Sequence, residues 1–216
     1  MVREGESIRR LVELVLELGS EEDRRARKGA GRSFARTEIL LHAMSVFNQQ
    51  GLEETSVQDL LDAAHISRRT FYKYFSGKID VLENIYILAS RVMIARFESE
   101  LPRLAARGQL VAGFLSIYFD YQLSVGRIVG LMMEEALRSA SPLAPHRRLM
   151  LDKVAALLQR EFARLGMPAA PYWQLMGLLW ALEGASLQLL SGRAQSAADM
   201  DACRRGMQEL WERALP

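Results

Sequence analysis

Apolar residues recur at helical spacing along most of the chain, and this pattern predicts a protein built of helices. Alternating apolar and polar runs, which would indicate strands, are scarce. The predicted helices cover residues 5–18, 36–50, 56–64, 68–75, 78–97, 109–124, 127–139, 145–165, 171–191 and 198–215. Leu101-Pro102 marks a boundary, because a residue that precedes proline is biased away from helical geometry. The pattern therefore predicts an all-α fold.

The composition agrees with this prediction. The chain has 216 residues, half of them hydrophobic, which is enough for one large or two small domains with a sizeable core. Ala, Leu, Arg, Glu and Met, which favour helices, dominate the sequence. The composition therefore supports a helical fold but does not indicate a function.

One stretch, residues 55–78 (TSVQDLLDAAHISRRTFYKYFSGK), reads as two short helices joined by a tight turn. Ser56 and Asp59 have the spacing of a capping box, which satisfies free N–H groups at the start of a helix. His65-Ile66 follows as the turn, and Ser67 is placed to cap the second helix. This arrangement is typical of a helix-turn-helix motif.

The second of these helices, predicted over 68–75, divides into two faces. Phe71 and Phe75 are four residues apart and share the buried side. The other faces carry basic and hydroxyl-bearing side chains: Arg68, Arg69, Thr70, Tyr72, Lys73 and Tyr74. Such a surface supplies donors for base edges and phosphates.

This segment resembles the N-terminal DNA-binding motif of TetR-type transcriptional regulators. Residues 70–78, TFYKYFSGK, are close to the family pattern T-x-Y-x-Y/H-F-x-x-K. Residues 37–47 and Gly51 are similar to the first helix of the family motif and its end, so the resemblance covers about residues 34–90. His65 stands where family members usually carry Gly, and we expect it to adopt the left-handed conformation of the turn.

The resemblance implies a helix-turn-helix domain over 34–80 and a ligand-binding and dimerisation domain over 81–216, and the sequence adds an extra helix and a basic arm over 1–33. It implies a sequence-specific regulator of transcription, a repressor that a small molecule releases from double-stranded operator DNA. The residues predicted to contact DNA are Thr37, Ser56, Arg68, Arg69, Thr70, Tyr72, Lys73, Tyr74 and Lys78.

Two of these predictions depend on where helices begin. Thr37 is placed to cap the helix 36–50, and a helix start there would also bring it near a phosphate. The resemblance implies that Lys78 meets a phosphate at the start of the helix 78–97, with Ser76 as the cap. This helix connects the two domains and is the expected lever between them.

Positive charge concentrates beside the motif. The net charge is only +2, but residues 24–78 carry ten basic and five acidic side chains. The candidates for a flexible arm that contacts DNA are Arg24, Arg25, Arg27, Lys28 and Arg32. A solvated linker is the alternative.

The helix 5–18 has a heptad-like apolar stripe that the family pattern does not include. It either packs on the body of the protein, or pairs with another subunit or masks the DNA-binding region. The sequence leaves these alternatives open.

The C-terminal region carries more apolar surface than one small core needs. Leucines lie on more than one face of the helix 171–191, and Gly177, Ala181, Gly184 and Ala185 would permit another helix to approach closely. The resemblance implies that the last two helices of each subunit build a homodimer interface.

The middle helices are rich in Tyr, Phe and Met, which could line a pocket for a small apolar or amphipathic ligand. Ordinary core packing is the alternative. The candidates are Tyr86, Met93, Phe114, Tyr118, Tyr121, Met132 and Met133. Glu183 is an unusual carboxylate among leucines, either paired at an interface or facing the pocket.

Other functional classes find little support. Cys203 is the one cysteine, which excludes an intramolecular disulfide and suits a reducing cytoplasm. Polar residues interrupt the stretch 172–190, so we expect a buried helix and no membrane association. His42, His65 and His146 have no metal-ligand or catalytic spacing, so we expect no metal, no cofactor and no enzyme activity. The remaining alternative is a helical protein-interaction and dimerisation module with secondary or lost DNA binding.

Overall fold

The computed structural model describes residues 30–190 and 197–215. The predicted helix 5–18 and the arm residues Arg24, Arg25, Arg27 and Lys28 lie outside this range. Every element in the described ranges is a helix, which confirms the all-α prediction: α3 (Ala30–Glu54), α4 (Val57–Ala63), α5 (Arg68–Tyr72), α6 (Lys78–Glu100), the short η2 (Leu101–Arg103), α7 (Arg107–Val125), α8 (Arg127–Leu137), α9 (Leu143–Arg164), α10 (Tyr172–Leu190) and α11 (Ala197–Ala214).

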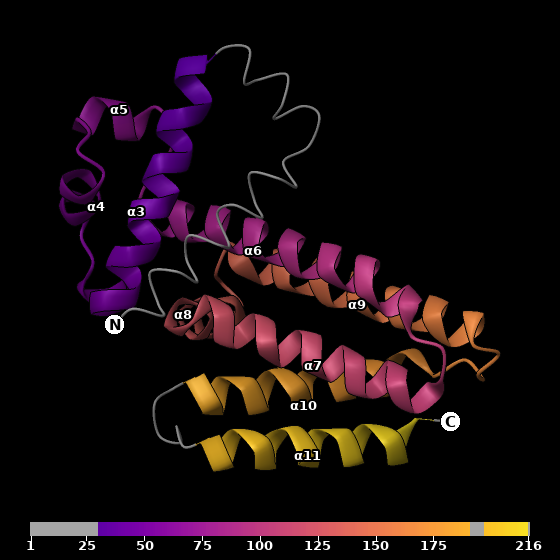
Figure 1. Cartoon of the computed structure of the whole chain (residues 1–216). Helices are drawn as coiled ribbons and strands as arrows, with labels where there is room; N and C mark the ends of the chain where they lie inside the picture. The colour runs from indigo at the N-terminus through magenta and orange to yellow at the C-terminus, as the bar shows by residue number, and fades with distance from the viewer. Residues whose placement is uncertain (1–29, 191–196, 216) are drawn as a thin grey trace.

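The helices form a small group at one end and a larger bundle that extends from it (Figure 1). Helices α3, α4 and α5 make the small group, and α6 leads from them into the bundle, where it runs beside α9. Helix α8 packs against both α9 and α10, while α11 packs against α7 and α10. Helix α8 also contacts α3 of the small group, so two helices join the groups.

Helix α3 differs from its prediction at one end and agrees at the other. Its described part begins at Ala30 and not at residue 36. Glycines near residue 30 suggested a flexible arm, but one Gly costs a helix only about 1 kcal/mol, and each added residue gains a backbone bond. The arm prediction is therefore wrong for the backbone at Arg32, and Thr37 lies inside the helix and does not cap it. Gly51 interrupts the helix as predicted, with φ 83° and ψ 176°, a region open essentially to glycine.

An aromatic stack fills the far end of the bundle. The rings of Phe97 on α6 and Phe114 on α7 lie 4.8 Å apart, and Phe114 lies 5.0 Å from Trp211 on α11. All three side chains are buried. Phe114 does not line the cavity described below, because its ring joins three helices in the core, and its place in a ligand pocket stays a prediction.

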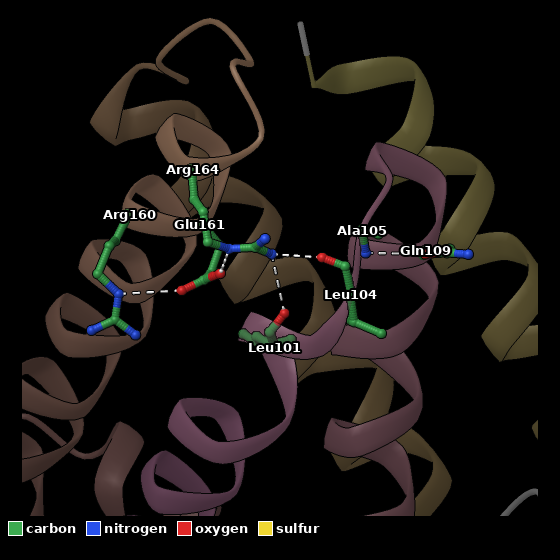
Figure 2. Close-up of polar contacts among 7 residues, drawn as sticks. All are labelled: Leu101, Leu104, Ala105, Gln109, Arg160, Glu161 and Arg164. Carbon is green, nitrogen blue, oxygen red and sulfur yellow. Dashed lines mark hydrogen bonds and ion pairs between the residues drawn. The ribbon is translucent and has the colours of Figure 1, made fainter.

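An arginine that is held by a buried carboxylate connects α9 to the turn after α6 (Figure 2). Glu161 accepts from Arg160 Nε at 3.2 Å and from Arg164 Nε at 2.6 Å. Arg164 Nη2 also donates to the carbonyls of Leu101 and Leu104, at 3.4 and 2.6 Å. These bonds hold the turn at η2, where the sequence predicted a boundary. Among the described helices, none combines the length and the apolar character that a bilayer crossing requires.

Candidate DNA-binding surface and internal cavity

The first helix of the motif, α4, begins with the predicted capping box. Ser56 Oγ accepts from the N–H of Asp59 at 3.2 Å, and Asp59 Oδ2 accepts from the N–H of Ser56 at 2.7 Å. The bonds from Ser56 lower the pKa of Asp59, so its carboxylate stays charged well below neutral pH. The Ser56 hydroxyl is thus engaged in the cap, because it also donates to Asp59 Oδ2 at 2.7 Å.

The turn and the second helix, α5, also form as the sequence predicted. His65 has φ 52°, the left-handed conformation expected of it. Ser67 caps α5 by accepting from the N–H of Thr70 at 3.2 Å. The helix ends at Tyr72, three residues before the predicted end, although the N–H of Phe75 still bonds to the carbonyl of Phe71 at 3.0 Å.

Helix α5 buries its phenylalanines and exposes its cations. Phe71 and Phe75 have almost no exposed surface, and their ring centroids lie 5.9 Å apart. Arg68, Arg69 and Lys73 are exposed, and 51% of Tyr72 is exposed. Phe71 and Phe75 thus form a buried aromatic root that anchors α5, while the charged side of the helix faces solvent.

Several exposed side chains of the motif are already oriented by neighbours. Arg68 Nη2 donates to Gln58 Oε1 on α4 at 3.0 Å, and Gln58 in turn donates to Asp62 at 2.8 Å. The ammonium of Lys73 lies 5.6 Å from the centre of the Tyr74 ring. Gln58 was not predicted as a site residue, although its position on α4, facing the start of α5, could have indicated the contact.

Lys78 has a different environment from the one the resemblance implied. Its Nζ donates to the carbonyls of Leu52, Glu53 and Thr55, at 2.8, 3.1 and 2.8 Å. The three hydrogens of the ammonium thus satisfy carbonyls that follow the break in α3. Contact with a phosphate stays a prediction, and it requires one of these bonds to open.

Ser76 does not cap α6. The residue at that position is Gly77, which makes no side-chain cap bond. Ser76 instead donates through its N–H and its hydroxyl to Asp80 Oδ2, at 2.7 and 3.1 Å. The acidic side chain in the first turn therefore replaces the serine as the group that fixes the helix start.

A cavity lies inside the bundle between α6, α7, α8, α9 and α10. Six of the seven residues predicted for a ligand pocket line it: Tyr86, Met93, Tyr118, Tyr121, Met132 and Met133. Ser90, Gln122, Met150 and Glu183 also line it. Ser90, Gln122 and Met150 were not predicted, because no sequence pattern distinguishes these three positions from ordinary helix packing.

The polar groups of the cavity are strongly desolvated. Burial, together with the negative charge of Glu183, raises the pKa of Tyr86 and Tyr118 far above the usual range, so both hydroxyls keep their protons. Burial also raises the pKa of Glu183, against the opposing effect of Arg147. Arg147 Nε donates to Glu183 Oε1 at 3.2 Å and a second bond joins Nη2 to Oε2, so Glu183 is both paired and at the cavity.

The outer face of α10 carries large apolar and small residues side by side. Trp173 and Trp180 are 72% and 44% exposed. Gly177, between the two tryptophans, and Gly184, one turn after Trp180, are exposed, and nothing lies within 4 Å of a Cβ added at either position. A second helix could therefore approach this face closely.

A capped helix-turn-helix with an exposed cationic helix, set on a helical bundle with an internal cavity, defines the class of helix-turn-helix regulators. The family model described as "Bacterial regulatory proteins, tetR family" matches residues 39–85. Residues 39–85 therefore carry the DNA-binding domain of the TetR family of transcriptional regulators, as the motif predicted. The TetR family is one of regulators and not of enzymes.

Individual proteins are similar over different shares of the chain. The transcriptional repressor KstR2 of Rhodococcus jostii is 38% identical over 56 residues, which is 26% of this chain and 28% of that protein. The match thus spans little more than a quarter of the curated relative. The structure of the fatty acid degradation regulator FadR from Bacillus halodurans is similar with a TM-score of 0.68 at 16% identity, over 82% of this chain and 93% of that one.

Two further structures of similar fold contain ligands. The TetR-family repressor FadR from Thermus thermophilus, in complex with lauroyl-CoA, has a TM-score of 0.58 at 18% identity, over 82% of this chain and 91% of that one. RolR in complex with resorcinol has a TM-score of 0.59 at 16% identity, over 84% and 89%. At these identities the similarity shows the shared fold alone.

Proposed function

We propose that this protein is a homodimeric transcriptional repressor that binds operator DNA through residues 34–80 and releases it when a small molecule enters the region 81–216. The observation that carries this proposal is the geometry of α5, which presents Arg68, Arg69, Tyr72 and Lys73 to solvent on a buried aromatic root. The repressor name of the R. jostii relative supports the direction of control. A cytoplasmic location, where operator DNA lies, belongs to the proposal.

Each side chain has a proposed role at the DNA. Arg68, Arg69 and Thr70 lie at the start of α5, where a recognition helix contacts base edges, and Gln58 would hold Arg68 in position. Tyr72, Lys73 and Tyr74 follow as phosphate and groove contacts. Ser56 and Lys78 are engaged in bonds within the protein, and Thr37 lies inside α3, so their contribution would be secondary.

A single short helix reads too few bases for tight binding, and a dimer presents two. The open face of α10, with Trp180 and Gly184, supports pairing with a second copy. In such a dimer the two recognition helices would enter successive major grooves about 34–36 Å apart.

Two helices would couple the cavity to the DNA-binding group. Helix α6 lines the cavity through Tyr86 and Met93, and its start holds α3 through Lys78. Helix α8 lines the cavity through Met132 and contacts α3 through Arg127, which donates to the carbonyl of Asn48 at 3.4 Å. A ligand that favours one position of these helices would shift the spacing of the recognition helices.

The test is selection of bound sequences from random duplex DNA by the full chain, followed by affinity measurements across salt concentrations. We expect a near-palindromic site and an affinity that falls steeply with salt, because bound phosphates release counterions. The double variant Tyr72→Ala with Lys73→Ala should abolish specific binding. Lys73→Ala alone should reduce the salt slope by about two for the dimer, one per copy.

Lys153→Ala is the matched control, since Lys153 is an exposed lysine on α9, away from α5. This variant should bind the selected site as the unaltered protein does. Failure to enrich any two-fold site would contradict the proposal. It would favour the alternative, a protein-interaction module that uses the exposed tryptophans of α10.

A further inference from the structure

The charge at the internal cavity has one sign. Among the described residues that line the cavity, Glu183 is the one with a charged side chain, and it is a carboxylate. Its partner Arg147 lines a separate outer groove together with Leu137, Trp180 and Leu187. Inside the cavity a ligand therefore lies beside the carboxylate, whereas the guanidinium faces the outer groove.

The same region contains a polar atom without a partner. Gln122 lines the cavity and is 6% exposed, and its Oε1 has no hydrogen-bond partner among the described residues. The Gln122 amide nitrogen lies 4.0 Å from Met133 Sδ, and the Tyr118 hydroxyl lies beside the side chains of Gln122 and Ser186. An unpaired buried acceptor is unfavourable, so a ligand that donates to Gln122 Oε1 would remove an existing penalty.

The remaining polar groups suit an uncharged ligand. Tyr86 and Tyr118 keep their protons, and Tyr121 uses its own hydroxyl hydrogen on the carbonyl of Ala89, at 2.7 Å. A hydroxyl group can both accept from a tyrosine and donate to an amide oxygen. A carboxylate or phosphate can only accept, and here it would lie beside Glu183.

We propose that, if the protein is the ligand-responsive regulator argued above, its cavity selects a small neutral molecule with an apolar body and a hydroxyl group, such as an alkylphenol. The hydroxyl donates to Gln122 Oε1, and the apolar body lies among the methionines. Anionic molecules such as carboxylates are excluded by Glu183.

The methionines provide the space. The cavity has a volume of about 40 Å³, room for a few waters and too little for an aromatic ring. Met93, Met132, Met133 and Met150 surround it, and their unbranched side chains change conformation easily. The outer groove, of about 380 Å³, shares Met133 and Glu183 with the cavity. Movement of the Met133 side chain would join the two spaces, so the ligand gains room at that wall.

The test uses three probes with one apolar body and different head groups: para-propylphenol, para-propylbenzoate and para-propylbenzylammonium. Binding of each to the full chain is measured by calorimetry at neutral pH. The phenol should bind at least about tenfold more tightly than the benzoate. Gln122→Met, which keeps the side-chain length and removes the amide, should weaken phenol binding about tenfold. Its thermal midpoint without probe should change little, because the variant loses an unpaired acceptor and only weak contacts of the amide nitrogen with Met133 and Tyr118.

The matched control is Gln159→Met, since the half-buried Gln159 on α9 donates to the carbonyl of Ala170 and does not line the cavity. It should bind the phenol as the unaltered chain does. If Gln122→Met does not unfold cooperatively, Gln122→Leu takes its place.

Several results would overturn the inference: benzoate binding equal to or tighter than phenol binding, tighter binding of the ammonium probe, binding of none of the three, or unchanged phenol affinity in the Gln122 variant. DNA affinity without probe is measured on the same preparation. If DNA binding is absent while the phenol preference depends on Gln122, the repressor function fails and the assignment of the cavity stands.

Discussion

At the scale of the residue, His65 shows how one side chain accepts an unusual backbone. Its φ of 52° places it in the left-handed region, which costs most L-residues about 1–2 kcal/mol. His is tolerated there better than most residues, while β-branched residues are not. The turn needs this conformation because the N–H of Ile66 bonds back to the carbonyl of Leu61 at 3.1 Å.

The effect of a substitution at His65 on stability should therefore depend on the backbone preference of the new residue and not on side-chain contacts. His65→Val should lower the free energy of unfolding by about 1–2 kcal/mol, whereas His65→Gly should leave it unchanged or raise it slightly. Urea unfolding followed by circular dichroism measures both. Equal destabilisation by Val and Gly would mean that the imidazole itself holds the turn.

At the scale of the element, the junction between α6 and α7 is held by Arg164, one of two arginines on α9 that share one carboxylate (Figure 2). The Glu161 side chain is 3% exposed, while those of Arg160 and Arg164 are 56% and 37% exposed. Arg164 differs because it also satisfies the carbonyls of Leu101 and Leu104. It therefore connects α9 to the turn, and Arg160 connects α9 only to itself.

The two arginines provide a matched pair of variants. Arg164→Ala should lower the free energy of unfolding by about 1–3 kcal/mol, since it leaves a buried carboxylate and two carbonyls with fewer partners. Arg160→Ala should change it by less than about 1 kcal/mol, as expected for an exposed ion pair. Chemical denaturation of both variants gives the comparison, and similar losses would contradict the role assigned to Arg164.

At the scale of the whole molecule, pairing of two copies depends on a face that the single chain leaves open. Trp180 is 44% exposed on α10, and the exposed Gly184 beside it has free space at its Cβ position. A side chain at Gly184 would be accommodated by the monomer and would meet only a partner. The proposed dimer can thus be tested without disturbing the fold.

Gly184→Glu should give a monomer at concentrations where the unaltered protein is a dimer, because a charge would be buried between partner helices. At concentrations where both proteins are monomers, the thermal midpoint of the variant should lie within a few degrees of that of the unaltered protein. The reason is that Glu has a higher helix propensity than Gly. Gly108→Glu, which also has free space at Cβ, is the control and should remain a dimer. Light scattering after size-exclusion chromatography measures the mass. A dimeric Gly184→Glu variant would show that this face of α10 does not form the interface.

The helix-turn-helix could be predicted in detail because its determinants are local. The capping box joins residues three apart, the Ser67 cap joins residues three apart, and the buried phenylalanines lie four apart. Such contacts follow from helical geometry alone. The helix starts of this motif, and its resemblance to the family, could therefore be predicted from residues close together in the sequence.

The tertiary structure decided what depends on residues distant in the chain. Lys78 finds its carbonyls 23 to 26 positions away, and Glu183 finds Arg147 across 36 positions. Phe114 and Tyr118 lie one turn apart on α7, yet the first stacks in the core and the second faces the cavity. Helical periodicity gives each residue a face, but only the packing of α6 to α11 determines which face meets a cavity, because that packing brings distant segments together.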